Sequence, residues 1–387
     1  MKLLARFLCA GLLLLVAASA PSRAEDPSSK AVVSALQPFV ESNSLAGAVT
    51  LVADKDKVLA IDAVGYADVA AKTPLKTNAV FWIASMSKPI TAAALMILVD
   101  EGKVKLDDPC EKYLPELKGL WLAAEQDKEH VLLKKPKRPP TIRDVLSHTS
   151  GMPFKSFMED PTIDHLTLRD CVRSYAITPL QSEPGTKYTY SNAGINTAGR
   201  IIEVVSGMPF ETFLEKRLFA PLGMKDTTFW PSGDQLKRLA RSYKPTADKK
   251  GLEETTVTAL RHPLDDRTRQ PSPGGGLFST AADCGKFCQM LLNRGTVGNM
   301  RVLSEDAVKE LSTRQTGKEI KESYGLGFSV GPDSFGHGGA YATNMTVDTK
   351  RGLVYVFMVQ HAGGFPGNGN QSQGAFRKVA EGQLGGK

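Results

Sequence analysis

Strand-like segments occur only near the two ends of this 387-residue chain, and this placement limits the folds that it can adopt. The segments that alternate or run apolar cover residues 47–52, 58–64, 324–330, 339–348 and 353–360. The first two flank a charged turn, which predicts a β-hairpin. Helices are predicted over residues 29–41 and 371–381, beside these strands. The pattern predicts an α+β protein with one antiparallel sheet built from both chain ends and flanked by helices.

The middle of the chain is predicted to be a mostly helical domain inserted into that sheet. Three Thr-x-x-Asp sequences have the spacing of N-terminal capping boxes, at Thr141 with Asp144, Thr167 with Asp170, and Thr280 with Asp283. The helical part is expected over about 81–299, and the sheet part over about 25–80 and 300–387. With 42% hydrophobic residues, the chain has the composition of a globular protein with a large core.

The first 24 residues have the features of a secretory signal peptide. Lys2 and Arg6 precede an apolar run over 8–18, and Ser22-Arg23-Ala24 ends in small residues. We expect cleavage after Ala24, an exported protein that is periplasmic or secreted, and one unit over residues 25–387. The apolar run is short for a bilayer, so no stable membrane span is expected after cleavage.

The charge of the chain argues against a nucleic-acid partner. Removing residues 1–24 takes away three cations and lowers the net charge from +7 to +4, which is only mildly basic. The one dense basic stretch, residues 134–138, contains a proline and no aromatic residue, so it predicts a solvated loop. The oligomeric state stays open.

Four cysteines remain after cleavage: Cys110, Cys171, Cys284 and Cys288. An exported protein can form disulfides, so their pairing stays open, although buried free thiols are the default. Cys284 and Cys288 are four residues apart in a predicted helix, which suits a disulfide poorly. No cysteine pair has histidines at the spacing of a zinc site, and no metal is expected.

A serine and a lysine stand at the start of the helix predicted over residues 81–102. Ser85 and Lys88 are three positions apart, so on a helix their side chains share a face. A serine hydroxyl is a weak nucleophile that needs a base, and burial lowers the pKa of an amine enough for it to accept a proton. The helix N-terminus adds N–H groups where an oxyanion can form. A capping serine beside a surface lysine is the alternative.

Two further motifs favour the catalytic reading. The chain has one S-x-x-K, at Ser85–Lys88, and one Y-x-N, at Tyr190-Ser191-Asn192, followed later by His337-Gly338-Gly339, which is predicted to open a strand. In this order the motifs resemble those of the serine β-lactamase and penicillin-binding-protein superfamily. The branch with class C β-lactamases, D-alanyl-D-alanine carboxypeptidases and family VIII carboxylesterases is most similar. Residues 146–152, 273–287 and 335–348 support the resemblance, which covers about 32–381.

The resemblance implies a serine hydrolase that works through an acyl-enzyme and without a cofactor. Ser85 is then the nucleophile, Lys88 and Tyr190 transfer its proton, and which of these two is the formal base stays open. The backbone N–H groups of Ser85 and Ala340 form the oxyanion hole. The substrate is a small molecule or a peptide.

The resemblance also assigns residues to substrate binding. Asn192 donates to a substrate carbonyl and holds Lys88. The residues His337, Gly338 and Gly339 line the substrate, and the two glycines let it approach the strand.

The third motif departs from the Lys-Thr-Gly that is usual in β-lactamases. His337 replaces a lysine whose charge attracts a substrate carboxylate, and Gly338 replaces the threonine hydroxyl. This argues against a preference for β-lactams and for an ester, amide or D-peptide as the acyl donor. If His337 is protonated as the pH falls toward 6, carboxylate substrates gain. A true β-lactamase and a catalytically silent protein that binds cell-wall peptide or a partner remain the alternatives.

Three other stretches are predicted to be structural. His148 is expected to be a packed, hydrogen-bonded histidine rather than a base. His361 follows the last strand and is discounted as a third motif. The glycines at 274–276 predict a tight turn beside the cleft rather than a phosphate loop, because the lysine of such a loop is missing.

Overall fold

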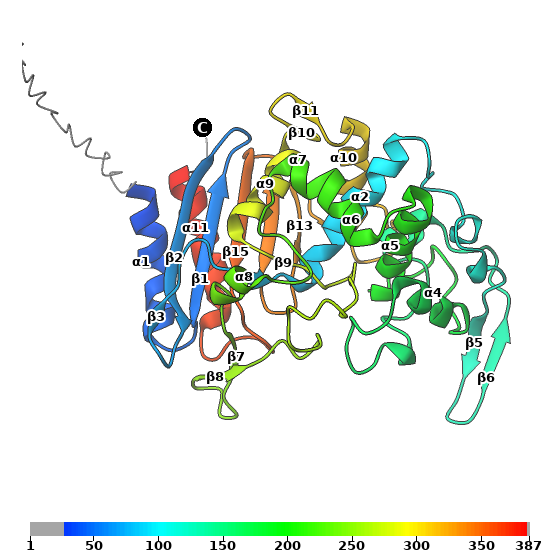
Figure 1. Cartoon of the computed structure of the whole chain (residues 1–387), viewed down its shortest axis with the longest axis horizontal. Coiled ribbons are helices and arrows are strands. Elements are labelled where there is room, and N and C mark those ends of the chain that lie inside the picture. Colours follow the sequence, from blue (N-terminus) through cyan, green and yellow to red (C-terminus); the bar gives the residue numbers. More distant parts are fainter. Residues whose placement is uncertain (1–26, 385–387) are drawn as a thin grey trace, which may run out of the picture.

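The computed structural model describes residues 27–384, and a seven-stranded antiparallel sheet lies at its centre (Figure 1). Its order is β12-β13-β14-β15-β1-β2-β3. The bounds are β1 Gly47–Ala53, β2 Val58–Asp68, β3 Thr73–Pro74, β12 Ser329–Val330, β13 Ser334–Gly338, β14 Asn344–Asp348 and β15 Leu353–Met358. Strand β1 pairs with β15, from Val49 opposite Met358 to Ala53 opposite Val354. The predicted fold class, a sheet that joins both chain ends, is therefore confirmed.

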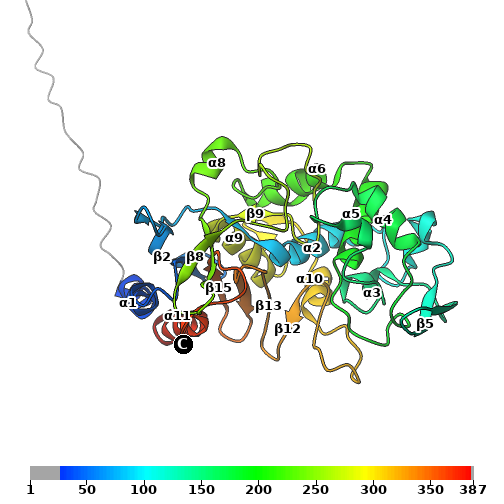
Figure 2. The same ribbon diagram turned by 90° about the horizontal axis from the view of Figure 1, so that it is seen from below.

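Helices cover both faces of this sheet. Strand β1 is buried along its whole length because its side chains alternate between two cores. Val49 and Leu51 belong to the larger core, which includes residues of α9 (Ala281–Leu292), and Val52 belongs to the core under α1 and α11. Helices α1 (Pro27–Glu41) and α11 (Ser372–Leu384) lie side by side (Figures 1 and 2). Terminal segments thus complete the core, as the pattern predicted.

The middle of the chain is mostly helical, as predicted. Its helices are α2 Ser87–Asp100, α3 Ile142–Leu146, α4 Leu168–Ala176, α5 Asn192–Ser206, α6 Phe210–Leu214, a π-helical turn Glu215–Phe219, α7 Ala220–Leu222, α8 Gly233–Lys237 and, after α9, α10 Glu305–Ser312. The predicted caps form, since Thr141, Thr167 and Thr280 each accept a hydrogen bond from the backbone N–H three residues later.

Four small hairpins or ladders in the described residues were not predicted. They are β4 (Phe81–Trp82) with β9 (Phe278–Ser279), β5 (Leu122–Gln126) with β6 (Val131–Lys134), β7 (Ser242–Pro245) with β8 (Leu252–Thr255), and β10 (Thr296–Val297) with β11 (Met300–Arg301). Strand β6 is exposed along its length, so no apolar alternation marks it. The β4–β9 pair joins residues almost 200 positions apart, which a local pattern cannot reveal.

Three predicted elements have wrong boundaries. The strand predicted over 324–330 is only β12, Ser329–Val330. The strand predicted over 339–348 is a turn followed by β14, because Gly339 N–H donates to Thr343 O at 2.7 Å and closes the turn. His337 and Gly338 therefore end β13 instead of opening a strand. The helix predicted over 81–102 begins only at Ser87. Helix α2 is buried on nearly all sides, because α5, α6 and α10 pack against it (Figure 2).

The predicted signal peptide and its cleavage site lie outside the described residues. Within residues 27–384, no helix is long and apolar enough to cross a membrane. The cysteines Cys110, Cys171, Cys284 and Cys288 are buried free thiols. Over the same residues, no three His, Cys, Asp or Glu side chains are grouped so as to hold a metal ion.

Candidate active site

Ser85 lies in a short 3₁₀ turn, Ala84–Met86, that immediately precedes α2. Ala84 has a φ of +46°, a conformation that costs a non-glycine residue on the order of 1 kcal/mol or more and persists only where its surroundings impose it. Here the neighbours do so: Ile83 N–H donates to Leu277 O at 3.0 Å, and Leu277 N–H donates to Ser87 Oγ at 3.2 Å. The turn places a partly accessible hydroxyl at the start of a buried helix.

The Lys88 amine is fully buried beside this hydroxyl. Its Nζ lies 3.2 Å from Ser85 Oγ and donates to the carbonyl oxygen of Gly274 at 2.6 Å. Burial lowers the pKa of Lys88 to about 7. At neutral pH a large share of this amine is therefore uncharged, with a lone pair that can accept a proton from the serine.

The Gly274 carbonyl is held in place by side chains from two helices. Thr91 Oγ1 on α2 donates to Pro273 O at 2.9 Å, and Gly274 N–H donates to Asn196 Oδ1 on α5 at 3.2 Å. Trp82 Nε1 donates to Gly275 O at 2.7 Å. The predicted tight turn at 274–276 is thus confirmed, but the sequence did not reveal that it supplies the acceptor for Lys88.

The Tyr190 phenol closes the group around Ser85. The Lys88 Nζ lies 4.6 Å from the centre of its ring. Burial raises the pKa of Tyr190 to about 12, against the opposing effect of a hydrogen bond with Ser85. Tyr190 is therefore a neutral phenol at pH 7, able to donate a proton. Ser191, the N-cap of α5, holds it there by donating from Oγ to Pro153 O at 2.6 Å.

Asn192 lies beside this group, but it does not hold Lys88 as predicted. Its Oδ1 is buried without a hydrogen-bond partner, and the amine donates to Ser85 and Gly274 instead. A Cβ on Gly274 would come within 2.8 Å of Asn192 Oδ1, so a glycine is needed at this contact. The Asn192 amide remains available to a substrate.

The His337 imidazole is buried and hydrogen-bonded to Tyr324. Ser191 N–H donates to His148 Nδ1 at 3.1 Å, so the proton of neutral His148 is on Nε2, 3.2 Å from the Tyr324 hydroxyl. Tyr324 then donates to His337 Nε2 at 2.9 Å, and His337 Nδ1 donates to Gly338 O at 2.6 Å. The predicted role of His148 as a hydrogen-bonded histidine is confirmed. Tyr324 is a central residue that no sequence motif marked.

The charge state of His337 differs from the expectation drawn from sequence. Burial, followed by repulsion from Lys88, lowers the pKa of His337 to about 4. At pH 6 the imidazole is therefore neutral, so the protonation on which the expected gain of carboxylate substrates depends does not occur at that pH. His361, which was discounted, is buried elsewhere and accepts a hydrogen bond from Ala46 N–H at 3.1 Å.

The end of β13 lies against the turn that holds Ser85. A Cβ on Gly339 would come within 2.6 Å of Ile83 O, so only glycine permits this approach. Gly338 is exposed, and the exposed Ala340 follows directly after the contact. The structure therefore brings the third motif to the first one, although 250 residues separate them in sequence.

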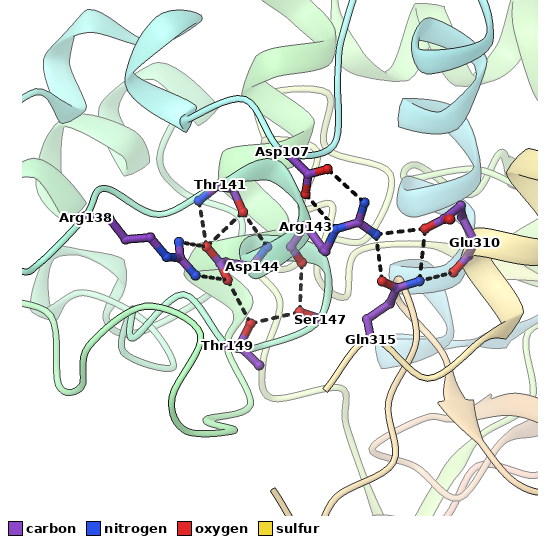
Figure 3. Close-up of polar contacts among 9 residues, drawn as sticks. All are labelled: Asp107, Arg138, Thr141, Arg143, Asp144, Ser147, Thr149, Glu310 and Gln315. Carbon is purple, nitrogen blue, oxygen red and sulfur yellow. Dashed lines mark hydrogen bonds and ion pairs between the residues drawn. The ribbon is translucent and has the colours of Figure 1, made fainter. Parts of the chain in front are cut away.

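The buried carboxylate of Asp144 joins a group of polar contacts (Figure 3). Asp144 on α3 accepts hydrogen bonds from Arg138, from the backbone and hydroxyl of Thr141, and from Thr149 Oγ1 at 3.1 Å. Because Thr149 O accepts from Gly185 N–H at 2.7 Å, Asp144 also orders the chain that leads to Tyr190. The capping box predicted at this position thus has a second role.

Arg143, the residue before Asp144, links this region to α10 (Figure 3). Its guanidinium donates to Asp107, to Glu310 at 2.8 Å and to Gln315 at 2.7 Å. The chain continues from α10 to Tyr324, which contacts His148. Arg143 and His148 therefore both contact the part of the chain that runs from α10 to Tyr324.

The fold is that of a superfamily of serine hydrolases that includes esterases, acyltransferases and carboxypeptidases. Within it the chain belongs to the beta-lactamase family, whose sequence profile, described as Beta-lactamase, matches residues 32–375. The chain is 33% identical over 363 residues to Protein Rv1367c of Mycobacterium tuberculosis (strain ATCC 25618 / H37Rv). The matched region covers 83% of this chain and 87% of that protein.

Two further proteins are similar over much of the chain. Lovastatin esterase of Penicillium rubens is 29% identical over 273 residues, covering 67% of this chain and 66% of the esterase. The solved structure of EstCE1, described as a hydrolase with promiscuous acyltransferase activity, superimposes with a TM-score of 0.76 over 91% of this chain and 98% of EstCE1, at 23% identity. At that identity the likeness to EstCE1 shows the fold alone.

Proposed function

We propose that this protein is an exported serine hydrolase that forms an acyl-enzyme on Ser85, with an uncharged ester as its preferred acyl donor. One observation carries the proposal: a fully buried amine, Lys88, lies 3.2 Å from the hydroxyl of Ser85 and has a pKa of about 7. Burial of an amine is unfavourable for stability, because it removes the charged form from water. A general base, in contrast, needs a pKa near the working pH, and burial supplies it here.

In this mechanism Ser85 Oγ attacks the carbonyl carbon of the substrate and loses its proton to Lys88, directly or through Tyr190. Tyr190 then donates a proton to the departing alcohol, and Lys88 restores the phenol. Water attacks the acyl-enzyme by the reverse use of the same groups, which releases the acid and regenerates Ser85.

The negative oxygen of the tetrahedral intermediate is stabilised by the backbone N–H groups of Ser85 and Ala340. The unpartnered amide of Asn192 binds a polar group of the substrate. Gly338, which is exposed and carries no side chain, admits the substrate along the end of β13, and Gly339 lets that end approach the turn of Ser85.

The choice of an uncharged ester follows from the third motif, which offers no cation to a carboxylate. His337 is neutral at pH 7 and its Nε2 is occupied by Tyr324, and Gly338 has no hydroxyl. Lovastatin esterase and EstCE1 support ester chemistry by analogy. Amides and D-peptides are the next candidates, and β-lactam hydrolysis and silent binding of a cell-wall peptide are the competing functions.

Intact-mass analysis after exposure to a fluorophosphonate and to a penicillin tests this proposal. We expect a fluorophosphonate adduct on the peptide that contains Ser85, little stable penicillin adduct, and no adduct in Ser85→Ala. A fluorophosphonate adduct on Ser191 or Ser279 would contradict the assignment. Rapid penicillin turnover would favour a true β-lactamase, and no adduct with either reagent would favour the silent protein.

Export is a separate part of the proposal, supported by the basic start, the apolar run and the Ser22-Arg23-Ala24 sequence. We expect the protein from its native host to begin at Glu25. N-terminal sequencing or mass analysis measures this, and a mature protein that keeps Met1 would contradict it.

A further inference from the structure

Residues 154–163 form a segment that begins at the phenol of Tyr190. Phe154 O accepts hydrogen bonds from Asn192 N–H at 2.9 Å and Ala193 N–H at 3.1 Å, which fix it to the start of α5. The Phe154 ring stacks beside Tyr190, with ring centres 6.2 Å apart and planes 23° from parallel. One end of the segment therefore borders the proton-transfer group of the proposed mechanism.

The other end of the segment borders the nucleophile. Ile163 packs in an apolar cluster that contains Trp82 and Ala84, the residue before Ser85. A Cβ on Gly275 would lie 3.3 Å from Ile163 Cδ1 and 3.8 Å from the Ala84 carbonyl carbon, so the three residues meet. The segment thus runs from the Tyr190 side of the site to the Ser85 side and forms a wall beside it.

This wall exposes three large apolar side chains within five residues. Phe154 is 47% exposed, Phe157 is 73% exposed and Met158 is 42% exposed. Exposed apolar area is unfavourable in water, and a concentration of it beside a reactive group is typical of a binding surface. We refer to these three residues as the apolar wall.

The apolar wall is held rigidly from beneath, so its exposure does not reflect a loose loop. The buried carboxyl of Glu159 accepts from Ser156 N–H at 2.8 Å, Tyr175 Oη at 2.9 Å and Asn196 Nδ2 at 3.2 Å. Ser174 Oγ donates to Ser156 Oγ at 2.7 Å. Burial raises the pKa of Glu159, which these donors oppose.

A second buried anchor follows the wall. Asp164 and Arg269 are almost inaccessible to solvent and form an ion pair of 2.7 Å. Because these contacts fix the segment at both ends, its backbone cannot move inward without breaking buried polar contacts. A preorganised surface of this kind binds an apolar group with little loss of conformational entropy.

We infer that the apolar wall binds an apolar chain of the ester substrate, carried on either the acyl or the alcohol side of the scissile bond. This inference rests on the proposed esterase function and names its substrate class: lipophilic esters rather than acetates of small alcohols. Phe154 and Phe157 are then the residues that determine specificity, because Phe154 lies beside Tyr190 and Phe157 is the most exposed side chain of the same wall.

Two series of esters test the inference. The first is p-nitrophenyl acetate, butanoate and octanoate, and the second is ethyl, butyl and octyl acetate, so that the acyl and alcohol sides are varied separately. For wild type we expect kcat/KM to rise about two- to fourfold per added methylene in one series, since each buried methylene contributes about that factor. In Phe154→Ala and Phe157→Ala the ratio of kcat/KM for the longest to the shortest ester should fall about tenfold.

Two controls separate a specific effect from a general loss of apolar surface. Leu132→Ala removes a 57% exposed leucine from β6, which lies at the far edge of the helical region (Figure 1), and should leave the ratio unchanged. Phe154→Leu keeps most of the apolar area and should keep most of the ratio.

Three other results would contradict either the role of the apolar wall or the esterase function. Ready hydrolysis of all esters in both series, without dependence on chain length, would overturn the apolar wall and leave the esterase function standing. An equal loss of the ratio in Leu132→Ala would also overturn the wall. If no ester is hydrolysed in a manner that depends on Ser85, the proposed function fails and the inference fails with it.

Discussion

The amine of Lys88 donates to the carbonyl oxygen of Gly274 at 2.6 Å, a contact between residues 186 positions apart in sequence. A neutral amine has two N–H donors and one lone pair. One N–H of Lys88 points to Gly274 O, so the other N–H and the lone pair take the two remaining directions. One of these directions is toward Ser85 Oγ. The contact therefore orients the base as well as holding it.

The pH dependence of the reaction should reveal the buried amine. Lys88 accepts a proton only in its neutral form, and burial lowers its pKa to about 7. Below pH 7 we expect kcat/KM for a neutral ester to fall about tenfold per pH unit, and above pH 7 to level off. The profile should stay flat to at least pH 9, because the pKa of Tyr190 is raised to about 12. A profile without an acid limb between pH 6 and 8 would contradict the assignment of Lys88.

Lys88 and Tyr190 should act as one proton-transfer unit. Lys88→Ala and Tyr190→Phe are each expected to lower kcat by about 10³-fold, and the double variant should be little worse, because coupled catalytic groups are strongly non-additive. The measurement is kcat for an ester in all four proteins, with circular dichroism as a check on folding. Effects that multiply would show that the two residues work independently.

The third motif should disfavour carboxylate substrates at every pH from 6 to 8. The pKa of His337 is lowered to about 4, so the imidazole does not gain a charge in this range. We expect the ratio of kcat/KM for a chromogenic cephalosporin to that for a neutral ester to be low and constant between pH 6 and 8. A ratio that rises as the pH falls to 6 would contradict the structure.

A variant at the same position tests whether a cation is what the third motif lacks. In His337→Lys the longer side chain has to leave the buried position of the imidazole and reach solvent to stay charged. A lysine that does so should raise the cephalosporin-to-ester ratio roughly 10- to 100-fold, because a charge-assisted hydrogen bond contributes about 1.5–3 kcal/mol. Efficient hydrolysis of the cephalosporin by wild type, without improvement by the lysine, would show that this motif does not set substrate preference.

The buried ion pair of Asp164 and Arg269, which follows the apolar wall in the chain, should contribute strongly to the free energy of unfolding. Arg269→Met leaves the Asp164 carboxylate buried without its cation, which is expected to lower the free energy of unfolding by about 3–5 kcal/mol. Urea denaturation measures the change. The control Lys244→Met breaks an ion pair with Glu253 in which both side chains are about half exposed, and should cost less than about 1 kcal/mol. Equal losses in the two variants would contradict the role of burial.

Several features of this protein follow from its sequence alone. The apolar alternation at both chain ends predicted a sheet that joins them, because strand patterning depends on near neighbours. Ser85 and Lys88 were paired because three residues bring side chains to one face of a helix, whatever the rest of the chain does. The N-caps at Thr141 and Thr280 were found for the same reason.

Other features were decided only by the tertiary structure, because burial and contacts over long sequence distances have no local signal. The Gly274 carbonyl meets Lys88 through packing of the 273–277 turn against α2 and α5. Tyr324 reaches His337 because β13 ends at Gly338, and that register turns the imidazole into the core and keeps it neutral. The sequence shows a lysine and a histidine, but only their desolvation decides that the pKa of Lys88 falls to about 7 and that of His337 to about 4.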